Sequence, residues 1–252
     1  MQVTILGTGT LVPHPERGAP GLAVSAGSET LLFDIGSGAL YRAAKAGIDW
    51  SGIAHIFLTH YHADHTLDLV SFLFACNYTP GARRQEKLNL YGPSGLREFY
   101  RAISAAWPSV KPLDYELELR ELDRGEAVGA GSGWEVRAAA MAHGDTGALA
   151  YRVDWGNKCM VYSGDTEYCE ALVEVSRGAD LLVCECSTDD RHRAAGHLSP
   201  EGVVRLVRET GLRRVLLTHV YPPLDPGTLA AACARGSGAQ VEAAVDMAVY
   251  EV

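Results

Sequence analysis

Apolar and polar positions along this chain form short blocks that predict strands and helices in turn. Apolar runs or period-two alternation, both typical of strands, occur in many of these blocks. The expected strand segments are 2–7, 21–36 (two strands around a Gly-Ser turn), 54–60, 87–93, 115–122, 134–143, 147–165 (a hairpin), 179–187, 213–219 and 240–252, which begins and ends strand-like. The expected helices are 37–48, 66–79, 94–107, 199–211 and 226–236. Strands that alternate with helices indicate an α/β fold.

Length and composition fit one globular domain over residues 1–252. The chain has 252 residues and 47% hydrophobic residues, enough for a full core. A net charge of −9 disfavours binding of nucleic acid or an anionic membrane by the whole surface. The first residues, MQVTILGTGT, already read as a strand, and no apolar run approaches 20 residues. We therefore expect a cytoplasmic protein, and we expect its six cysteines to be reduced.

One short segment, at the end of an expected strand, contains several side chains that can bind a metal. The residues THYHADH, 59–65, contain three histidines and one aspartate at H-x-H-x-D-H spacing. A single histidine at a strand end is more often a surface or capping residue than a ligand. Four such groups in seven residues favour a metal site, because imidazole and carboxylate are the side chains that bind zinc and related ions.

Further metal-competent side chains follow other expected strands. His143, Asp165 and His219 each come directly after an apolar segment. Open α/β sheets place their sites at the carboxyl ends of strands, so we expect these groups to meet. Together they make five histidines and two aspartates: His60, His62, Asp64, His65, His143, Asp165 and His219. Because one zinc ion takes about four ligands, the set suits two metals that share a carboxylate.

With these motifs the sequence resembles the metallo-β-lactamase superfamily, and within it the ribonuclease Z-like branch. The segments THYHADH, AHGDTGALAYRV, YSGDT and LTHVYPP are similar to its motifs, in the same order. The opening LGTGTLVPHPERGAPGLAV and the later LLFDIGSG also resemble this branch. The resemblance implies an αββα sandwich, in which helices flank two β-sheets and the metals lie at the sheet edge.

The resemblance also implies roles for the seven residues. His60, His62 and His143 would bind a first metal, Asp64, His65 and His219 a second, and Asp165 both. The expected cofactor is two Zn²⁺, with Mn²⁺ or Fe²⁺ as alternatives. Two such ions would activate a shared water as a bridging hydroxide at neutral pH. Asp64 is also a candidate for orienting that water.

A second pair of residues is implied to transfer protons. Glu185 ends an expected strand and His197 lies in the following loop. In the ribonuclease Z-like branch, residues at these positions form a relay in which the histidine protonates the leaving group. The alternative is a buried structural acid and an ordinary loop histidine. The tRNA-processing members usually have His-Glu-Ala-Thr here, whereas this chain has Cys-Glu-Cys-Ser, which weakens the comparison.

Other polar residues are weaker candidates for substrate contacts. His14 follows a glycine loop, and Arg191 and Arg193 lie near His197, where arginines would suit a phosphate. Exposed loop arginines are common without any ligand. Asp68 is either an acid that supports a ligand histidine or a first-turn helix aspartate.

The expected substrate is a small or nucleotide phosphodiester rather than a large RNA. In many tRNA-processing relatives a long arm is inserted between the third histidine and the bridging aspartate. Here only 21 residues separate His143 from Asp165, and a hairpin occupies them. Sulfate esters, lactones and thioesters remain alternatives, as do a diiron redox protein and a metal-dependent binding protein. A homodimer is a further expectation, with the apolar segment LVSFLFACNY as core or dimer surface.

Overall fold

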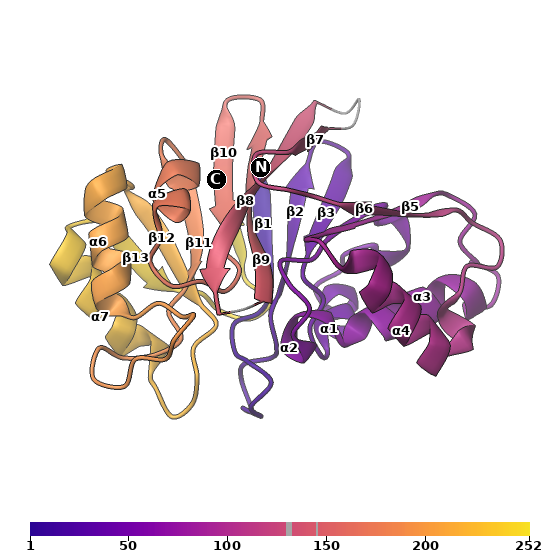
Figure 1. Cartoon of the computed structure of the whole chain (residues 1–252), viewed down its shortest axis with the longest axis horizontal. Coiled ribbons are helices and arrows are strands. Elements are labelled where there is room, and N and C mark those ends of the chain that lie inside the picture. Colours follow the sequence, from indigo (N-terminus) through magenta and orange to yellow (C-terminus); the bar gives the residue numbers. More distant parts are fainter. Residues whose placement is uncertain (130–132, 145) are drawn as a thin grey trace.

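The computed structural model describes residues 1–129, 133–144 and 146–252 and contains two β-sheets that pack face to face (Figure 1). The first sheet has the strand order β14-β1-β2-β3-β4-β5-β6. Its strands are β1 (Gln2–Gly7), β2 (Gly21–Ala26), β3 (Glu29–Phe33), β4 (His55–Phe57), β5 (Leu88–Gly92), β6 (Leu117–Glu121) and β14 (Val249–Glu251). Strands β14 to β3 pair antiparallel, and β3 to β6 pair parallel.

The second sheet repeats this arrangement, with the order β13-β12-β11-β10-β9-β8-β7. Its strands are β7 (Ala127–Gly129), β8 (Trp134–His143), β9 (Thr146–Trp155), β10 (Lys158–Tyr162), β11 (Leu181–Glu185), β12 (Arg214–Thr218) and β13 (Gln240–Ala243). The strands from β7 to β10 are antiparallel, and those from β10 to β13 are parallel. The parallel strands β10, β11 and β12 are largely apolar and buried because both of their faces are covered.

Helices cover the outer face of each sheet. Figure 1 shows α1, α3 and α4 beside the first sheet and α5, α6 and α7 beside the second. The helices are α1 (Ala39–Lys45), α2 (Ala63–Thr66), α3 (Asp68–Tyr78), α4 (Leu96–Ala106), α5 (Glu170–Ser176), α6 (Pro200–Thr210) and α7 (Pro226–Ser237). The expected αββα sandwich, with helices flanking two β-sheets, is therefore confirmed.

Among the described residues, three apolar clusters hold the layers together. The central cluster lies between the sheets and includes Phe33, Phe57 and Tyr151, all fully buried. The rings of Phe33 and Phe57 stack at 4.9 Å between centroids. The two outer clusters join each sheet to its own helices. Burial of these aromatic groups supplies much of the driving force for packing the sheets.

The element prediction was right in outline and wrong in several details. The expected helix at 66–79 is divided into α2 and α3, and α2 begins inside the histidine cluster at Ala63. Strand β7 and helix α5 were not predicted. The segment 240–252 supplies β13 to the second sheet and β14 to the first. The same thirteen-residue segment therefore links the two sheets.

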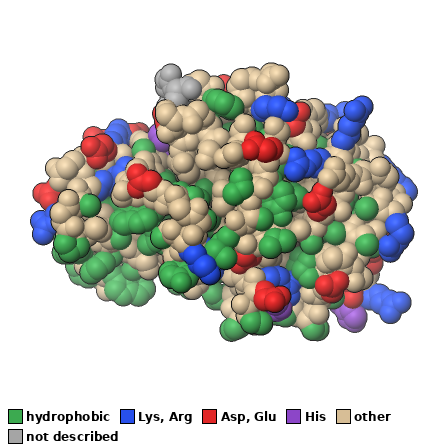
Figure 2. Space-filling model, turned by 180° about the vertical axis from the view of Figure 1, so that it is seen from behind, with side chains coloured by type: hydrophobic (Ala, Val, Ile, Leu, Met, Phe, Trp, Pro, Cys, Tyr) green, Lys and Arg blue, Asp and Glu red, His purple; other side chains and the backbone are tan. Residues whose placement is uncertain are grey.

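The surface has one side where large apolar side chains are exposed. Seen from behind, hydrophobic side chains gather at the lower left, on the side where Figure 1 places α1, α3 and α4 (Figure 2). Leu67, Phe74 and Tyr78 of the α3 region are each at least 40% exposed. Whether this surface forms a homodimer stays a prediction.

No helix within the described residues combines the length and the apolar character that crossing a membrane requires.

Candidate metal centre

The seven predicted ligands come together at the edge of the sandwich where strands of both sheets end. His60 and His62 follow β4, Asp64 and His65 lie on α2, and His143 is the last residue of β8. The remaining two, Asp165 and His219, follow β10 and β12. All except His62 and Asp64 are buried. The structure therefore places all seven where the strand-end pattern predicted them.

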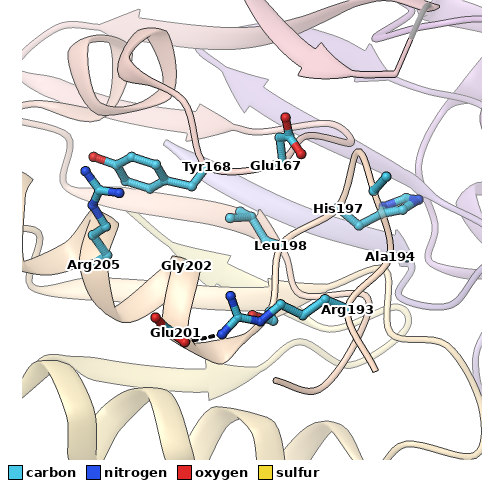
Figure 3. A pocket seen from close by; sticks show the side chains of 11 residues that line it. Glu167, Tyr168, Arg193, Ala194, His197, Leu198, Glu201, Gly202 and Arg205 are labelled. Carbon is cyan, nitrogen blue, oxygen red and sulfur yellow. Dashed lines mark hydrogen bonds and ion pairs between the residues drawn. The ribbon is translucent and has the colours of Figure 1, made fainter. Parts of the chain in front are cut away.

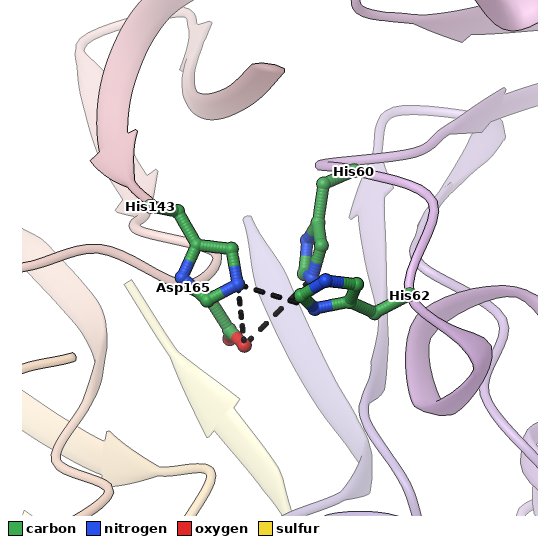
Figure 4. A group of neighbouring side chains, drawn as sticks. All are labelled: His60, His62, His143 and Asp165. Atoms are coloured by element: carbon green, nitrogen blue, oxygen red, sulfur yellow. Dashed lines mark hydrogen bonds and ion pairs between the residues drawn. The ribbon is translucent and has the colours of Figure 1, made fainter. Parts of the chain in front are cut away.

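Within the described residues three overlapping groups of donor atoms occur, and two of them consist only of predicted ligands. The third joins Asp165 and His219 to His197. In the first, His60, His62, His143 and Asp165 each offer one atom, and these atoms lie within 4.8 Å of one another (Figure 4). The Nδ1 atom of His62 is 3.2 Å from Nε2 of His143. In the second group, one donor atom from each of Asp64, His65 and His219 also lies within 4.8 Å of the others. Nε2 of His219 is 3.3 Å from Oδ2 of Asp64.

Asp165 belongs to the first group and also lies close to the imidazoles of the second. Its Oδ1 is 3.3 Å from Nε2 of His65, and its Oδ2 is 3.4 Å from Nε2 of His219. The same Oδ2 is 3.8 Å from Nε2 of His60 and 3.9 Å from Nε2 of His143. Although burial alone would raise it, the pKa of Asp165 is held well below its ordinary value by His219, His65 and His60. One ionised carboxylate thus faces imidazoles of both groups.

Hydrogen bonds fix which nitrogen of His60 and His65 faces the centre. Nδ1 of His65 is 2.7 Å from Oδ2 of Asp34, a carboxylate that can only accept, so this nitrogen carries the proton. Thr59 Oγ1 donates to Asp34, so it accepts from Nδ1 of His60 at 3.0 Å. In both residues Nε2 faces the other ligands. Burial, followed by the charges of neighbouring groups led by His65, lowers the pKa of His60 to about 2, which keeps it neutral.

Hydrogen bonds also fix which nitrogen of His143 and which nitrogen of His219 carries the proton. Nδ1 of His143 donates to the Gly196 carbonyl at 2.8 Å. Ser187 Oγ donates to Glu185 at 2.6 Å, so it accepts from Nδ1 of His219 at 2.8 Å. Such partners orient imidazoles for metal binding.

The donor set fits divalent metal ions. Nε2 of His60 and Oδ1 of Asp165 are buried and have no hydrogen-bond partner within the described residues. An unpaired buried polar atom is costly, and a cation would satisfy both. Five imidazoles and two carboxylates are the ligand types that zinc prefers, and the two groups are each large enough for one ion.

Glu185 and His197 lie next to this centre as a hydrogen-bonded pair. Nδ1 of His197 is 3.0 Å from Oε1 of Glu185 and 4.0 Å from Oδ2 of Asp165. Glu185 is fully buried and also accepts from the backbone amides of Thr166 and Leu198. Burial lowers the pKa of His197, but the hydrogen bond and charge of Glu185 outweigh it and raise the pKa above its ordinary value. The pair therefore has the geometry of an oriented proton donor.

The weaker candidates lie farther from the cluster. His14 lines a hollow beside Arg17 and Pro222 that includes none of the seven residues. Arg191 is exposed, and its only described hydrogen bond runs from its backbone amide to Asp189. Arg193 forms an ion pair with Glu201. Their substrate-binding roles stay predictions.

Arg193 and His197 border a hollow of about 440 Å³ beside the first turns of α6. In Figure 3 the imidazole of His197 points away from this hollow, and Arg193 reaches Glu201 across its floor. On the far side the guanidinium of Arg205 lies 3.9 Å from the ring centre of Tyr168. The hollow therefore adjoins the backbone of the His197 loop.

Sequence reasoning missed several residues that build the site. Asp34 was quoted in LLFDIGSG without a role, although it follows an apolar strand in the same way as the predicted ligands. Ser187 and Tyr221 were also missed. Asp68, left open between two roles, accepts from the backbone amide of Leu40 at the start of α1. It is a helix-terminal residue with no described contact to the seven.

Comparisons with known proteins agree with this geometry. Residues 30–220 match the family model described as a beta-lactamase superfamily domain. Ribonuclease Z of Mycobacterium sp. (strain KMS) is 31% identical over 278 positions, which cover 100% of this chain and 96% of the relative. Ribonuclease Z of Methanosarcina acetivorans is 28% identical, with 87% of each chain covered.

Two solved structures share the fold over nearly their whole length. The metallo-beta-lactamase fold protein YhfI from Bacillus subtilis superposes with a TM-score of 0.87 at 23% identity, covering 100% of this chain and 99% of that one. The short form of human tRNase Z superposes with a TM-score of 0.81 at 25% identity and the same coverage.

Proposed function

Because this chain belongs to the metallo-β-lactamase superfamily and to its ribonuclease Z-like branch, we propose that it is a dinuclear zinc enzyme that cleaves phosphodiester bonds in small or nucleotide substrates. It is a metal-dependent hydrolase with a His/Asp cluster able to bind metal. The observation that carries the dinuclear proposal is the position of Asp165 between the two groups of imidazoles.

In this proposal the two groups hold one ion each. His60, His62 and His143 would hold the first, Asp64, His65 and His219 the second, and Asp165 both. When bound, the ions supply Lewis-acid chemistry that activates water and offsets charge on the phosphoryl oxygens. Asp64 is the least buried of the carboxylates in the cluster, which supports its proposed role in orienting the attacking water.

The proposed proton transfer uses the His197 side chain. Its Nδ1 donates to Glu185, which leaves Nε2 to protonate the oxygen of the departing group. Because Glu185 is buried and bound by backbone amides, it cannot rotate freely, and it fixes the plane of the imidazole. Proton donation matters most when the leaving oxygen is strongly basic.

Three observations support a small substrate. The hairpin β9–β10 uses most of the 21 residues between His143 and Asp165, so no arm is inserted there. The net charge of −9 offers little to offset many phosphates. The alignment with the Mycobacterium relative runs over 278 positions against 252 residues here, so about 26 positions have no counterpart in this chain.

Cleavage of a precursor RNA is the second candidate. It is favoured by the names of the relatives, which are ribonuclease Z proteins, and by the likeness to the short form of human tRNase Z. Sulfate esters, lactones and thioesters are further ester classes for the same chemistry, and a diiron redox role is the least favoured.

The test compares catalytic efficiency on a chromogenic phosphodiester and on a precursor tRNA, using zinc-loaded protein. We expect kcat/KM to be higher for the small diester, and we expect the Asp165→Ala variant to lose activity on both. Sulfate ester, lactone and thioester substrates in the same panel should be cleaved more slowly. Efficient, site-selective trimming of the precursor tRNA would overturn the small-substrate proposal in favour of RNA processing.

A further inference from the structure

Tyr221 lies beside the metal centre and had no role in the sequence reasoning. It follows the last predicted ligand by two residues, and its ring faces two imidazoles of the site. Its centroid is 5.8 Å from that of His219 and 6.2 Å from that of His197, with the ring planes at 75° and 76°. The imidazoles of His197 and His219 are stacked on each other at 5.6 Å. Tyr221 therefore closes one side of the space beside the proposed proton donor.

The backbone around Tyr221 is fixed from several directions. Its amide donates to the carbonyl of Ser187, and its carbonyl accepts from the amide of Leu224. The guanidinium of Arg17 donates to the carbonyls of Val220 at 3.1 Å and Leu224 at 3.4 Å. The backbone that carries the ring is thus fixed before a substrate arrives, which reduces the entropy lost on binding.

The hydroxyl of Tyr221 is a proton donor without a described acceptor. The hydroxyls of Tyr61, Tyr151 and Tyr162, which lie deeper, donate to Pro93, Leu58 and Asp34 respectively. No hydrogen bond of the Tyr221 hydroxyl occurs among the residues that the structure describes, and the side chain is half-buried. A tyrosine hydroxyl carries one proton that it can donate in a hydrogen bond.

We propose that Tyr221 contacts the substrate, and that its hydroxyl donates a hydrogen bond to a non-bridging oxygen of the phosphoryl group. This inference rests on the proposed phosphodiesterase function. The ring would pack against the departing group on the side of His197, and the hydroxyl would stabilise negative charge that increases on the phosphoryl oxygens during attack. Three other hydroxyls near the centre, those of Thr59, Tyr162 and Ser187, already donate to Asp34 or Glu185.

The test uses Tyr221→Phe, which removes the hydroxyl and keeps the ring. Tyr41→Phe is the matched control, since Tyr41 is 71% exposed on α1. A hydrogen bond to a charged group contributes enough that its loss costs about tenfold or more. For Tyr221→Phe we expect kcat/KM on the chromogenic diester to fall by about that factor. We also expect the Kd for inorganic phosphate on the zinc-loaded protein, measured by calorimetry, to rise by about the same factor.

Other readouts separate substrate contact from a structural role. Metal content and Tm of Tyr221→Phe should equal those of the wild type. A Tyr221→Phe variant with wild-type phosphate affinity and kinetics would overturn the proposal, as would loss of zinc, which would make the residue structural. If the wild type cleaves no phosphodiester but binds phosphate through the Tyr221 hydroxyl, the inference stands and the proposed function fails. If the wild type cleaves the diester but Tyr221→Phe leaves the Kd for inorganic phosphate unchanged, the inference fails and the proposed function stands.

Discussion

At the scale of single residues, Asp34 shows how one buried carboxylate organises several parts of the site. It is fully buried and accepts hydrogen bonds from the Thr59 amide and hydroxyl, Nδ1 of His65 and the Tyr162 hydroxyl. Its backbone has a φ of 52°, a conformation that aspartate and asparagine adopt more readily than most residues. Asp34 therefore fixes the imidazole of His65 and the chain that leads into His60.

We predict that Asp34→Asn weakens metal binding without unfolding the protein. Asparagine tolerates the backbone conformation, but its amide nitrogen would face donors in either orientation. It would face His65 and Tyr162 at the position of Oδ2, or the Thr59 amide at the position of Oδ1. Removing such a supporting acceptor typically lowers metal affinity by about 10–100-fold. Competition with a chromophoric zinc chelator would measure this. Asp68→Asn is the control, because Asp68 caps α1 and has no described contact with the ligands. Equal zinc affinity in the two variants would exclude this role.

His197→Ala separates proton transfer from metal binding. His197 is not among the seven predicted ligands, although its Nδ1 is 4.0 Å from Asp165. We expect unchanged metal content and a kcat lower by roughly 10²–10⁴-fold. The loss should be smaller for a nitrophenolate leaving group than for a basic alkoxide, and Glu185→Gln should show the same pattern more weakly. Equal losses on both substrates, or loss of zinc, would contradict the assignment as general acid.

At the scale of elements, close backbone contacts hold the strand ends and α2 together. A Cβ atom at Gly36 would lie 1.9 Å from the carbonyl oxygen of Asp64 and 2.7 Å from that of Pro20. The amide of Ile35 also donates to the carbonyl of His65 at 2.8 Å. The turn after β3 therefore supports the short helix that carries Asp64 and His65.

Gly36→Ala should damage this junction. The added methyl group would collide with backbone atoms, which cannot move cheaply, so we expect a loss of about 1–3 kcal/mol or more in unfolding free energy and weaker zinc binding. Gly227→Ala is the control, since a Cβ there would make an ordinary 3.4 Å contact in the first turn of α7. Urea denaturation would measure both variants. A Gly36→Ala protein as stable as the control would show that the loop adapts.

At the scale of the whole molecule, polar residues at strand ends were enough to predict the His/Asp cluster. They were not enough to predict the hydrogen-bond partners that orient its imidazoles. The seven residues could be found because each follows an apolar segment, and parallel strands share an edge. The Ser187–His219 contact depends on the pairing of β11 with β12, which no local pattern reveals. Likewise, the division of residues 240–252 between two sheets follows from tertiary packing alone.

The central claim is that one carboxylate joins two metal sites across the sandwich. The most direct measurement is the number of zinc ions per chain, by elemental analysis of the wild type and Asp165→Ala. The variant Glu167→Ala, an exposed acid two residues away, serves as the control. We predict close to two ions in the wild type and the control, and reduced occupancy of both sites in Asp165→Ala. One ion per chain in the wild type, or full retention of both ions in Asp165→Ala, would contradict the account.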